Sequence, residues 1–392
     1  YGSIAGNATG VVVLIWLLRR RLGCRFSWPP FRALVTGIVG SAAAAAVGVG
    51  HVSSWALLVL GVAAFVTLVG VTGAIVEGVS LARPVYLGLM KSARRARRRP
   101  MSSVWDRAWA IAVRRFGNET LTVPVHGRSL RLNFGHPYPA FMRRYPGYNR
   151  PLVELVHRVF EAQGRPLVVV DVGASIGDTA ALIDANCPGA VAAFHCIEAD
   201  DAFFALLEEN LGSERRAHLY RVMVSSDGAT ARSLVRVHAG TASSQGDEQV
   251  PTMRLDHLMS QAGPIDVVKI DTDGFDGRVL AGSTELLKAS SPAIQFEWHP
   301  DLYEQAGSDI QQPFVVLAGA GYQRFHWFDK YGRFEQTMTD PSPEMLVAQR
   351  ERCRDAAEPD WHYDVIAVPE SVGVDEDGLV GLGFSRDMPS PW

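Results

Sequence analysis

An acid and two glycines follow a run of β-branched residues in the middle of the chain. Residues 168–170 are all valine, which is typical of a strand buried on both faces of a parallel sheet. The run leads into Asp171, and Gly173 and Gly177 follow in a Gly-x-x-x-Gly spacing. Asp178 can then cap a helix over 180–186. Such a strand, turn and helix present a nucleotide-like ligand at the carboxyl edge of a doubly wound sheet, with glycines where a Cβ would collide with the ligand.

The acid at the strand end indicates the charge of that ligand. The turn lacks the third glycine of a G-x-G-x-x-G pyrophosphate cradle, which disfavours a nicotinamide-dependent oxidoreductase. A carboxylate suits a cationic ligand better than a diphosphate, and S-adenosylmethionine carries an amino group and a sulfonium. We therefore expect Asp171, Gly173, Gly177 and Asp178 to bind S-adenosylmethionine. An ordinary turn between a strand and a helix, without a ligand, is the alternative.

Further strand-like segments also end near an acid. They are 192–197 before Glu198, 219–224 shortly before Asp227, 265–270 before Asp271 and 293–296 before Glu297. Because the carboxyl ends of parallel strands meet at one edge of a sheet, these acids form the pattern of a ligand site. Glu198, at the end of the second strand, is expected to accept hydrogen bonds from two ribose hydroxyls. Asp227 either meets the adenine amino group or forms a plain Asp-Gly turn.

Four stretches of this region occur in an order seen in one enzyme family. They read V-V-V-D-V-G-A-S-I-G-D, F-H-C-I-E-A-D-D-A-F-F-A-L-L-E-E-N-L, V-P-T-M-R-L-D-H-L and I-D-V-V-K-I-D-T-D-G-F-D-G-R-V-L-A-G. Residues 165–300, and more loosely those up to 368, thereby resemble the FkbM-family methyltransferases. The resemblance implies a class I, Rossmann-like α/β fold with a mostly parallel seven-stranded sheet. It also implies an S-adenosylmethionine-dependent O-methyltransferase, of a kind that commonly acts on sugar or polyketide hydroxyls.

Methyl transfer to a hydroxyl needs an aligned acceptor and, because a sugar hydroxyl is a poor nucleophile, a general base. His299, Asp271 and Asp273 are the candidates, and only histidine has an ordinary pKa near neutrality. A plain loop position is the alternative for His299. Lys269 either organises the Asp271 carboxylate or extends its ammonium toward solvent. Asp273 and Glu297 are expected to contact the acceptor, although the family often has Glu at position 273. No metal is expected, since two acids two residues apart are common in turns.

Two long stretches near the start of the chain carry no charge. No Asp, Glu, Lys or Arg occurs in 1–18 or in 33–76, and a polar break at 51–54 divides the second stretch. A helix of about 20 apolar residues crosses a bilayer, so we expect transmembrane helices near 1–18, 33–50 and 55–76. Buried helices of a protein core are the alternative. A signal peptide is a further alternative for 1–18, although there the arginines follow the apolar stretch instead of preceding it.

Basic residues orient the expected spans. They cluster at 19–32, between the first two spans, and at 83–99, after the third, whereas the loop at 51–54 has none. The positive-inside rule places both clusters, and everything after residue 83, in the cytoplasm. Residues 94–99 would then contact anionic lipid. Four cysteines without metal or disulfide spacing fit a reducing compartment, and a net charge of -3 gives no case for nucleic-acid binding.

The three spans resemble the last helices of a polysaccharide or oligosaccharide flippase of the multidrug-exporter-like superfamily. The motif Y-G-S-I-A-G-N-A-T-G at 1–10, the arginines behind the first span and the small residues of the second carry this resemblance. Three helices are too few for a transporter, so the resemblance implies a transporter remnant joined to another domain. Because the chain begins with Tyr1, we expect a fragment or a processed form.

The expected organisation has five parts. They are transmembrane helices at 1–82, a basic linker at 83–100, an N-terminal extension at 101–166, a methyltransferase domain at 167–370 and a flexible tail at 371–392. The extension is expected to hold helices over 104–116 and 152–163 and strands over 121–125 and 129–134. Its aromatic, basic segment 136–148 either lines a substrate mouth or forms a structural loop. Later elements are expected at 202–210, 275–288, 311–319, 322–327, 328–334 and 363–368.

The sequence therefore predicts a membrane-tethered, cytoplasmic O-methyltransferase that modifies a hydroxyl of a sugar or glycan precursor. The sugar rests on the two resemblances. A non-catalytic glycan-binding module attached to the transporter remnant is the alternative.

Overall fold

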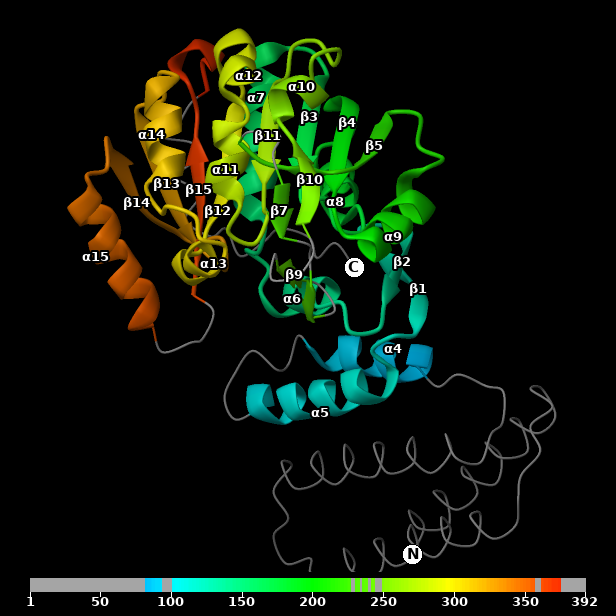
Figure 1. Ribbon diagram of the computed structural model, residues 1–392. Coiled ribbons are helices and arrows are strands. Elements are labelled where there is room, and N and C mark those ends of the chain that lie inside the picture. Colours follow the sequence, from blue (N-terminus) through cyan, green and yellow to red (C-terminus); the bar gives the residue numbers. More distant parts are fainter. Residues whose placement is uncertain are drawn as a thin grey trace, which may run out of the picture. The chain divides into compact units, whose positions relative to one another are not determined.

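The computed structural model describes residues 82–93, 101–226, 230–232, 235–238, 241–243, 249–356 and 361–374 (Figure 1). The three expected membrane spans, Asp227 and most of the expected tail lie outside the described residues. Within the described ranges, no helix combines the length and the apolarity that a bilayer crossing requires. The chain divides into two compact units, one of residues 1–92 with 102–115 and one of residues 93–101 with 116–392.

The described part of the first unit is a pair of helices. They are α4 (Ala82–Ala93), within the expected basic linker, and α5 (Met101–Phe116), which confirms the amphipathic helix expected over 104–116. Aromatic side chains join the two helices. Trp109 of α5 lies 6.2 Å from Tyr86 of α4 between ring centroids, and the indole N–H of Trp105 donates to the carbonyl of Leu89 at 3.1 Å.

The second unit is built on an eight-stranded sheet in the order β14-β13-β15-β12-β11-β3-β4-β5. The strands are β3 (Leu167–Val172), β4 (Val191–Glu198), β5 (Ala217–Arg221), β11 (Val267–Ile270), β12 (Ala293–Trp298), β13 (Arg324–Asp329), β14 (Phe334–Thr339) and β15 (Tyr363–Ala367). The five strands from β12 to β5 are parallel, and β15, inserted between β12 and β13, is antiparallel to both. This arrangement confirms the class I α/β fold. The sheet has one strand more than expected, because the hairpin after β13 adds β14 at the edge.

The remaining elements of this unit are short strands and connecting helices. The helices are α6 (Tyr138–Arg144), α7 (Arg150–Gln163), α8 (Asp178–Asn186), α9 (Asp201–Leu211), α10 (Leu255–Leu258), α11 (Asp276–Ala281), α12 (Thr284–Ser290), α13 (Pro300–Gln305), α14 (Gln312–Gly319), α15 (Pro343–Arg354) and η2 (Glu370–Val372). The strands are β1 (Thr120–Val125), β2 (Arg128–Asn133), β6 (Met223–Val224), β7 (Thr230–Arg232), β8 (Val235–His238), β9 (Thr241–Ser243) and β10 (Gln249–Met253).

Two expected elements are divided in the structure. The single helix expected over 275–288 is α11 followed by α12, with a break at Gly282. A Cβ at Gly282 would overlap the carbonyl of Ser225, so the chain passes too close there for a larger residue. The strand expected over 219–224 is β5 in the main sheet followed by β6, which pairs with β10 instead.

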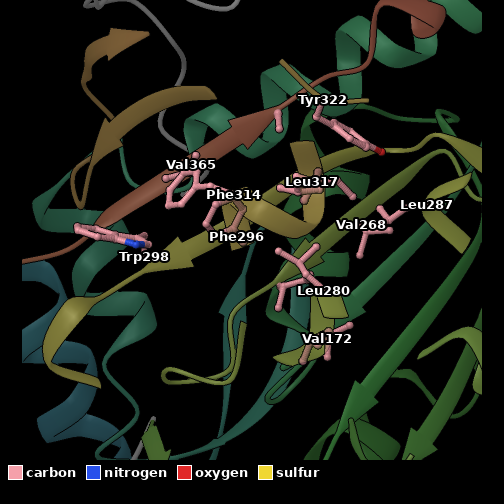
Figure 2. Close-up of a cluster of buried hydrophobic side chains, with 14 of the residues drawn as sticks. Val172, Val268, Leu280, Leu287, Phe296, Trp298, Phe314, Leu317, Tyr322 and Val365 are labelled. Carbon is pink, nitrogen blue, oxygen red and sulfur yellow. The ribbon is translucent and has the colours of Figure 1, made fainter. Parts of the chain in front are cut away.

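One face of the sheet carries the main hydrophobic core. Figure 2 shows Val268 of β11 and Phe296 of β12 close to Leu280 of α11 and Leu317 of α14. Alternate residues of a strand point to opposite faces, so neighbours of these apolar residues face the other way. Those neighbours include Lys269 and Gln295, which are adjacent in the register of β11 and β12. The polar face, against which α7 packs, therefore brings charged side chains toward the carboxyl edge.

Candidate functional site

The turn between β3 and α8 requires glycine for a reason that the sequence did not indicate. Gly173 and Gly177 have φ values of +84° and +85°, in the left-handed region. A Cβ at Gly173 would overlap the backbone carbonyl of Asp271, and one at Gly177 would lie 2.8 Å from a methyl carbon of Leu211. We expected these glycines to make room for a ligand. The structure adds a further reason, because the protein itself leaves no room for a Cβ at either position, and the ligand contact stays a prediction.

Glu198 fixes this turn from the end of β4. One carboxylate oxygen accepts from the backbone N–H of Ser175 at 2.8 Å, and the other accepts from that of Asp200 at 2.7 Å. Burial raises the pKa of Glu198 to about 7, although the two N–H groups favour the ionised form. Each oxygen keeps a second lone pair, so the carboxylate can still accept ribose hydroxyls. The residue therefore lies beside the glycine turn, where the sequence placed it.

A buried ammonium group connects the first and fourth parallel strands. Lys269 Nζ lies 3.1 Å from Asp171 Oδ1 and 3.3 Å from Asp271 Oδ2, and it donates to the carbonyl of Gly173 at 3.2 Å. Lys269 is 7% exposed, so it does not extend toward solvent. Burial lowers its pKa, but Asp171, Asp271 and Asp178 outweigh that effect and hold the pKa well above the usual value. Of the two interpretations of Lys269, these contacts favour organisation of the Asp271 carboxylate.

Asp178 and Asp273 come from the two turns that follow β3 and β11. Asp178 is buried in the first turn of α8, and burial raises its pKa to about 7. Asp273 has a φ of +50°, and Gly274 follows it, in the turn between β11 and α11. Among the residues described, no group of three or more His, Cys, Asp and Glu has the geometry to hold a metal ion.

Three acids lie near the ends of β12 and β15 and in the turn after β11, and of these Asp276 is buried while Glu297 and Asp364 are partly buried. Glu297 is the register partner of Asp364 across β12 and β15. Asp276 accepts from the backbone N–H of Glu297 at 3.3 Å and from the hydroxyl of Thr272 at 3.1 Å. Burial, strengthened by Asp271, raises the pKa values of Asp276 and Asp364 to about 7. The same causes raise the pKa of Glu297 well above its ordinary range. Neither Asp276 nor Asp364 was among the predicted site residues.

His299 has a structural role that the sequence left open. It is the N-cap of α13, and its Nδ1 accepts from the backbone N–H of Leu302 at 3.4 Å. The short helix α13 was not predicted, and the cap gives His299 a structural role, while its catalytic role stays a prediction.

His362 is a second histidine at this edge and was also missed. Its ring stacks on that of His299 at 5.4 Å between centroids, with the planes 23° apart. Its Nε2 lies 3.5 Å from Oε1 of Glu297. Within the described part of the chain, Oε2 of Glu297 is buried and has no hydrogen-bond partner. His362 comes from the segment just before β15, so its approach to Glu297 depends on strand pairing that a sequence pattern does not reveal.

The segment 136–148 reaches the same edge. His136 contacts the hydroxyl of Ser175 in the glycine turn at 3.3 Å. Burial raises the pKa of Tyr148 well above its ordinary value, and the charges of Asp271, Asp364, Asp178 and Glu297 raise it further. Tyr145 lies 4.2 Å from Tyr331 between ring centroids, beside the β13–β14 hairpin. Residues 138–144 of this segment are helical, and both interpretations of it, a substrate mouth and a structural loop, stay predictions.

Residues 171–324 match the family model for the methyltransferase FkbM domain. Solved structures that are similar to the chain include an FkbM methyltransferase from Methylobacillus flagellatus KT, with 16% identity and a TM-score of 0.33 over 52% of this chain and 43% of that one. A precorrin-6y C5,15-methyltransferase from Geobacter metallireducens GS-15 is 13% identical, with a TM-score of 0.30 over 55% and 88%. Aeropyrum pernix fibrillarin with natively bound S-adenosyl-L-methionine is 9% identical, with a TM-score of 0.30 over 52% and 67%. No curated protein matches the chain.

Proposed function

We propose that this chain, whose residues 171–324 are an FkbM, S-adenosylmethionine-dependent methyltransferase domain, methylates a hydroxyl of a sugar or glycan precursor. One observation carries the proposal. Asp271, Glu297 and Asp364 lie along one edge of the sheet, beside the turn that Gly173 begins. Carboxylates accept hydrogen bonds from hydroxyl groups, so this edge suits an acceptor rich in hydroxyls and repels a phosphate-rich one.

The residues around the glycine turn fit the cofactor. S-adenosylmethionine supplies an electrophilic methyl group on a positively charged sulfur. Asp171, Asp178 and Asp271 outnumber the single ammonium of Lys269 among the groups that interact there, which favours a cationic ligand. Glu198 would accept the ribose hydroxyls, and Asp171 and Lys269 would hold the carboxyl edge in place beneath the cofactor.

Aromatic side chains near the acids support a sugar. Tyr145 packs on Tyr331, and Trp361 meets Tyr331 edge to face at 6.0 Å between centroids. Trp361 directly precedes His362, and Tyr331 belongs to the hairpin after β13. Aromatic rings offer flat apolar contact area, and polar groups beside them fix orientation, which is the combination that a sugar ring requires.

Methyl transfer to a panel of simple sugars tests the acceptor class. The full chain would be incubated with methyl-labelled S-adenosylmethionine and with the methyl glycosides of glucose, galactose, mannose, rhamnose and glucuronic acid. We expect label in at least one methyl ether. Label that enters amino groups, thiols or carbon atoms of a cell extract, but no glycoside, would refute the sugar hydroxyl.

We also propose that the chain is tethered to a membrane with the methyltransferase domain in the cytoplasm, next to polysaccharide biosynthesis. The support is the sequence alone, namely the uncharged stretches 1–18 and 33–76 and the basic clusters after each. Reporters fused after residue 52 and after residue 100 are expected to report opposite sides of the membrane. Two reporters on the same side would remove the two spans between 33 and 76.

A further inference from the structure

On the polar face of the sheet, residues at the ends of β12 and β15 and just beyond them lie opposite one another in pairs. Glu297 of β12 is the register partner of Asp364 of β15, which runs in the opposite direction. Two residues further out, the same register places His299 beside His362, and the stacked rings of the two histidines agree with it. Because strand residues two apart share a face, Glu297, Asp364, His299 and His362 all project to one side. That side carries Lys269 further into the sheet.

Among the described residues, Glu297 has one carboxylate oxygen that is buried and lacks a hydrogen-bond partner; the oxygens of Asp171 also lack one, but Asp171 lies against Lys269 inside the sheet. Both oxygens of Asp276 accept hydrogen bonds, one from Thr272 and one from the backbone of Glu297. Asp271 is paired with Lys269, whose Nζ lies 3.3 Å from its Oδ2. Glu297 has His362 at Oε1, whereas its Oε2 is buried without a partner among the described residues. Buried polar atoms in proteins are nearly always hydrogen-bonded, so we expect a donor for this oxygen, such as a hydroxyl of a ligand.

We propose that Glu297 is the general base of the methyl transfer and that His362 is the positioning residue that holds its carboxylate, so that Oε2 faces the acceptor hydroxyl. The inference rests on the proposed function, because it needs a hydroxyl acceptor. The contact between His362 Nε2 and Glu297 Oε1, at 3.5 Å, is long for a hydrogen bond, as such contacts often are before substrates bind.

The step balances as follows. The acceptor oxygen forms a bond to the methyl carbon, and the bond from that carbon to sulfur breaks with its electron pair left on sulfur. The hydroxyl proton passes to Oε2 of Glu297. The positive charge of the sulfonium and the negative charge of the carboxylate are both lost, which leaves a neutral thioether, a methyl ether and a protonated carboxyl group. Glu297 then returns the proton to solvent.

The titratable groups around Glu297 favour its role as a general base. The titratable groups around it are Asp271, Asp273 and Asp276 from the turn after β11, Asp364 and His362 from β15 and the residue before it, His299 and Tyr303 from the start of α13, and Tyr148. Burial and the four aspartates raise the pKa of Glu297, which makes its ionised form a stronger base than an exposed glutamate. A histidine donor at Oε1 would favour the ionised form, which is the form that can accept the hydroxyl proton.

Two variants and a matched control pair test the proposal with methyl-labelled S-adenosylmethionine and the glycoside that the wild type methylates. We expect Glu297→Gln to lower kcat/KM by about 10²–10⁴-fold while S-adenosylmethionine still binds normally. We expect His362→Gln to lower kcat/KM by about 10-fold at pH 7 and to move the acidic limb of the pH profile upward by about one unit. On α7, His157 contacts Glu161 at 3.4 Å in an exposed pair, so His157→Gln and Glu161→Gln should change neither rate nor profile.

Infrared spectroscopy gives a measurement that needs no acceptor. The band of the protonated Glu297 carboxyl is identified by its absence in Glu297→Gln and is then followed as the pH is changed. The midpoint for this band should move upward in His362→Gln. Near-wild-type turnover by Glu297→Gln would show that Glu297 is not the general base. If neither the acidic limb of the pH profile nor the midpoint of the infrared titration moves in His362→Gln, His362 does not position the carboxylate. A wild type that methylates no hydroxyl at all would instead refute the proposed function, and the base role would fall with it.

Discussion

Lys269 Nζ lies 3.1 Å from Asp171 Oδ1 inside the sheet, between the two parallel strands that carry the ligand-binding edge. A second contact, at 3.3 Å, joins the same ammonium to Asp271, which is about half exposed. Lys269 thus links Asp171, inside the sheet, to Asp271 at the edge of the sheet. Taking charges out of water is costly, and a buried ion pair is tolerated only while both partners remain.

Removing the ammonium should therefore destabilise the domain strongly. Lys269→Met leaves Asp171 buried without its partner, and we expect a loss of about 3–5 kcal/mol in the free energy of unfolding, measured by urea denaturation. Lys288 pairs with Glu285 at 3.2 Å on the surface, so Lys288→Met should cost about 1 kcal/mol or less. Similar small losses in both variants would show that the Lys269 pair does not support the fold.

Two glycines with positive φ allow the cost of a steric clash to be separated from the cost of backbone strain. Gly173 and Gly189 have φ values of +84° and +78°, but only at Gly173 would a Cβ meet other atoms. Gly189→Ala should cost about 1–2 kcal/mol, the strain of a left-handed alanine. Gly173→Ala should cost at least about 2 kcal/mol more in thermal or urea unfolding, because the new methyl group displaces the Asp271 carbonyl. Equal costs would mean that the turn can move away from Asp271.

Local patterns were sufficient for most of the sheet and much of the cofactor side of the site. The valine run before Asp171 and the acid Glu198 after β4 lie within single strand–turn–helix units, so their position follows from nearby residues. Asp364 and His362 could not be found in this way, because they reach Glu297 through an antiparallel strand inserted from far along the chain. His299 was a candidate base because only histidine has an ordinary pKa near neutrality. Its place as the N-cap of the short helix α13 shows only in three dimensions.

The buried acids predict an unusual pH dependence. Burial raises the pKa of Asp276 from 3.8 to about 7, so between these values the folded chain holds a proton that the unfolded chain has lost. This acid therefore weakens the fold as pH rises from about 4 to 7. Asp276→Asn keeps an acceptor for the Glu297 N–H and removes the charge. We expect its free energy of unfolding to match that of the wild type near pH 4.5 and to exceed it by on the order of 1–3 kcal/mol at pH 8.

The exposed Asp201 provides the control, since it also lies in the first turn of a helix. Asp201→Asn should shift stability by less than about 0.5 kcal/mol at either pH. An Asp276→Asn variant that gains nothing between pH 4.5 and pH 8 would show that Asp276 ionises freely in the folded chain.

Binding of S-adenosylmethionine is the most direct test of the ligand edge. Calorimetric titration at pH 8 keeps the Glu198 carboxyl ionised, because its pKa is raised only to about 7. We expect one S-adenosylmethionine per wild-type chain, no binding of NAD, and a loss of about 1.5–3 kcal/mol in Glu198→Ala, the scale of hydrogen bonds to a charged group. Glu208→Ala, on the exposed side of α9, should bind as the wild type does. Unchanged affinity in Glu198→Ala, or binding of NAD in place of S-adenosylmethionine, would contradict the site at the carboxyl edge.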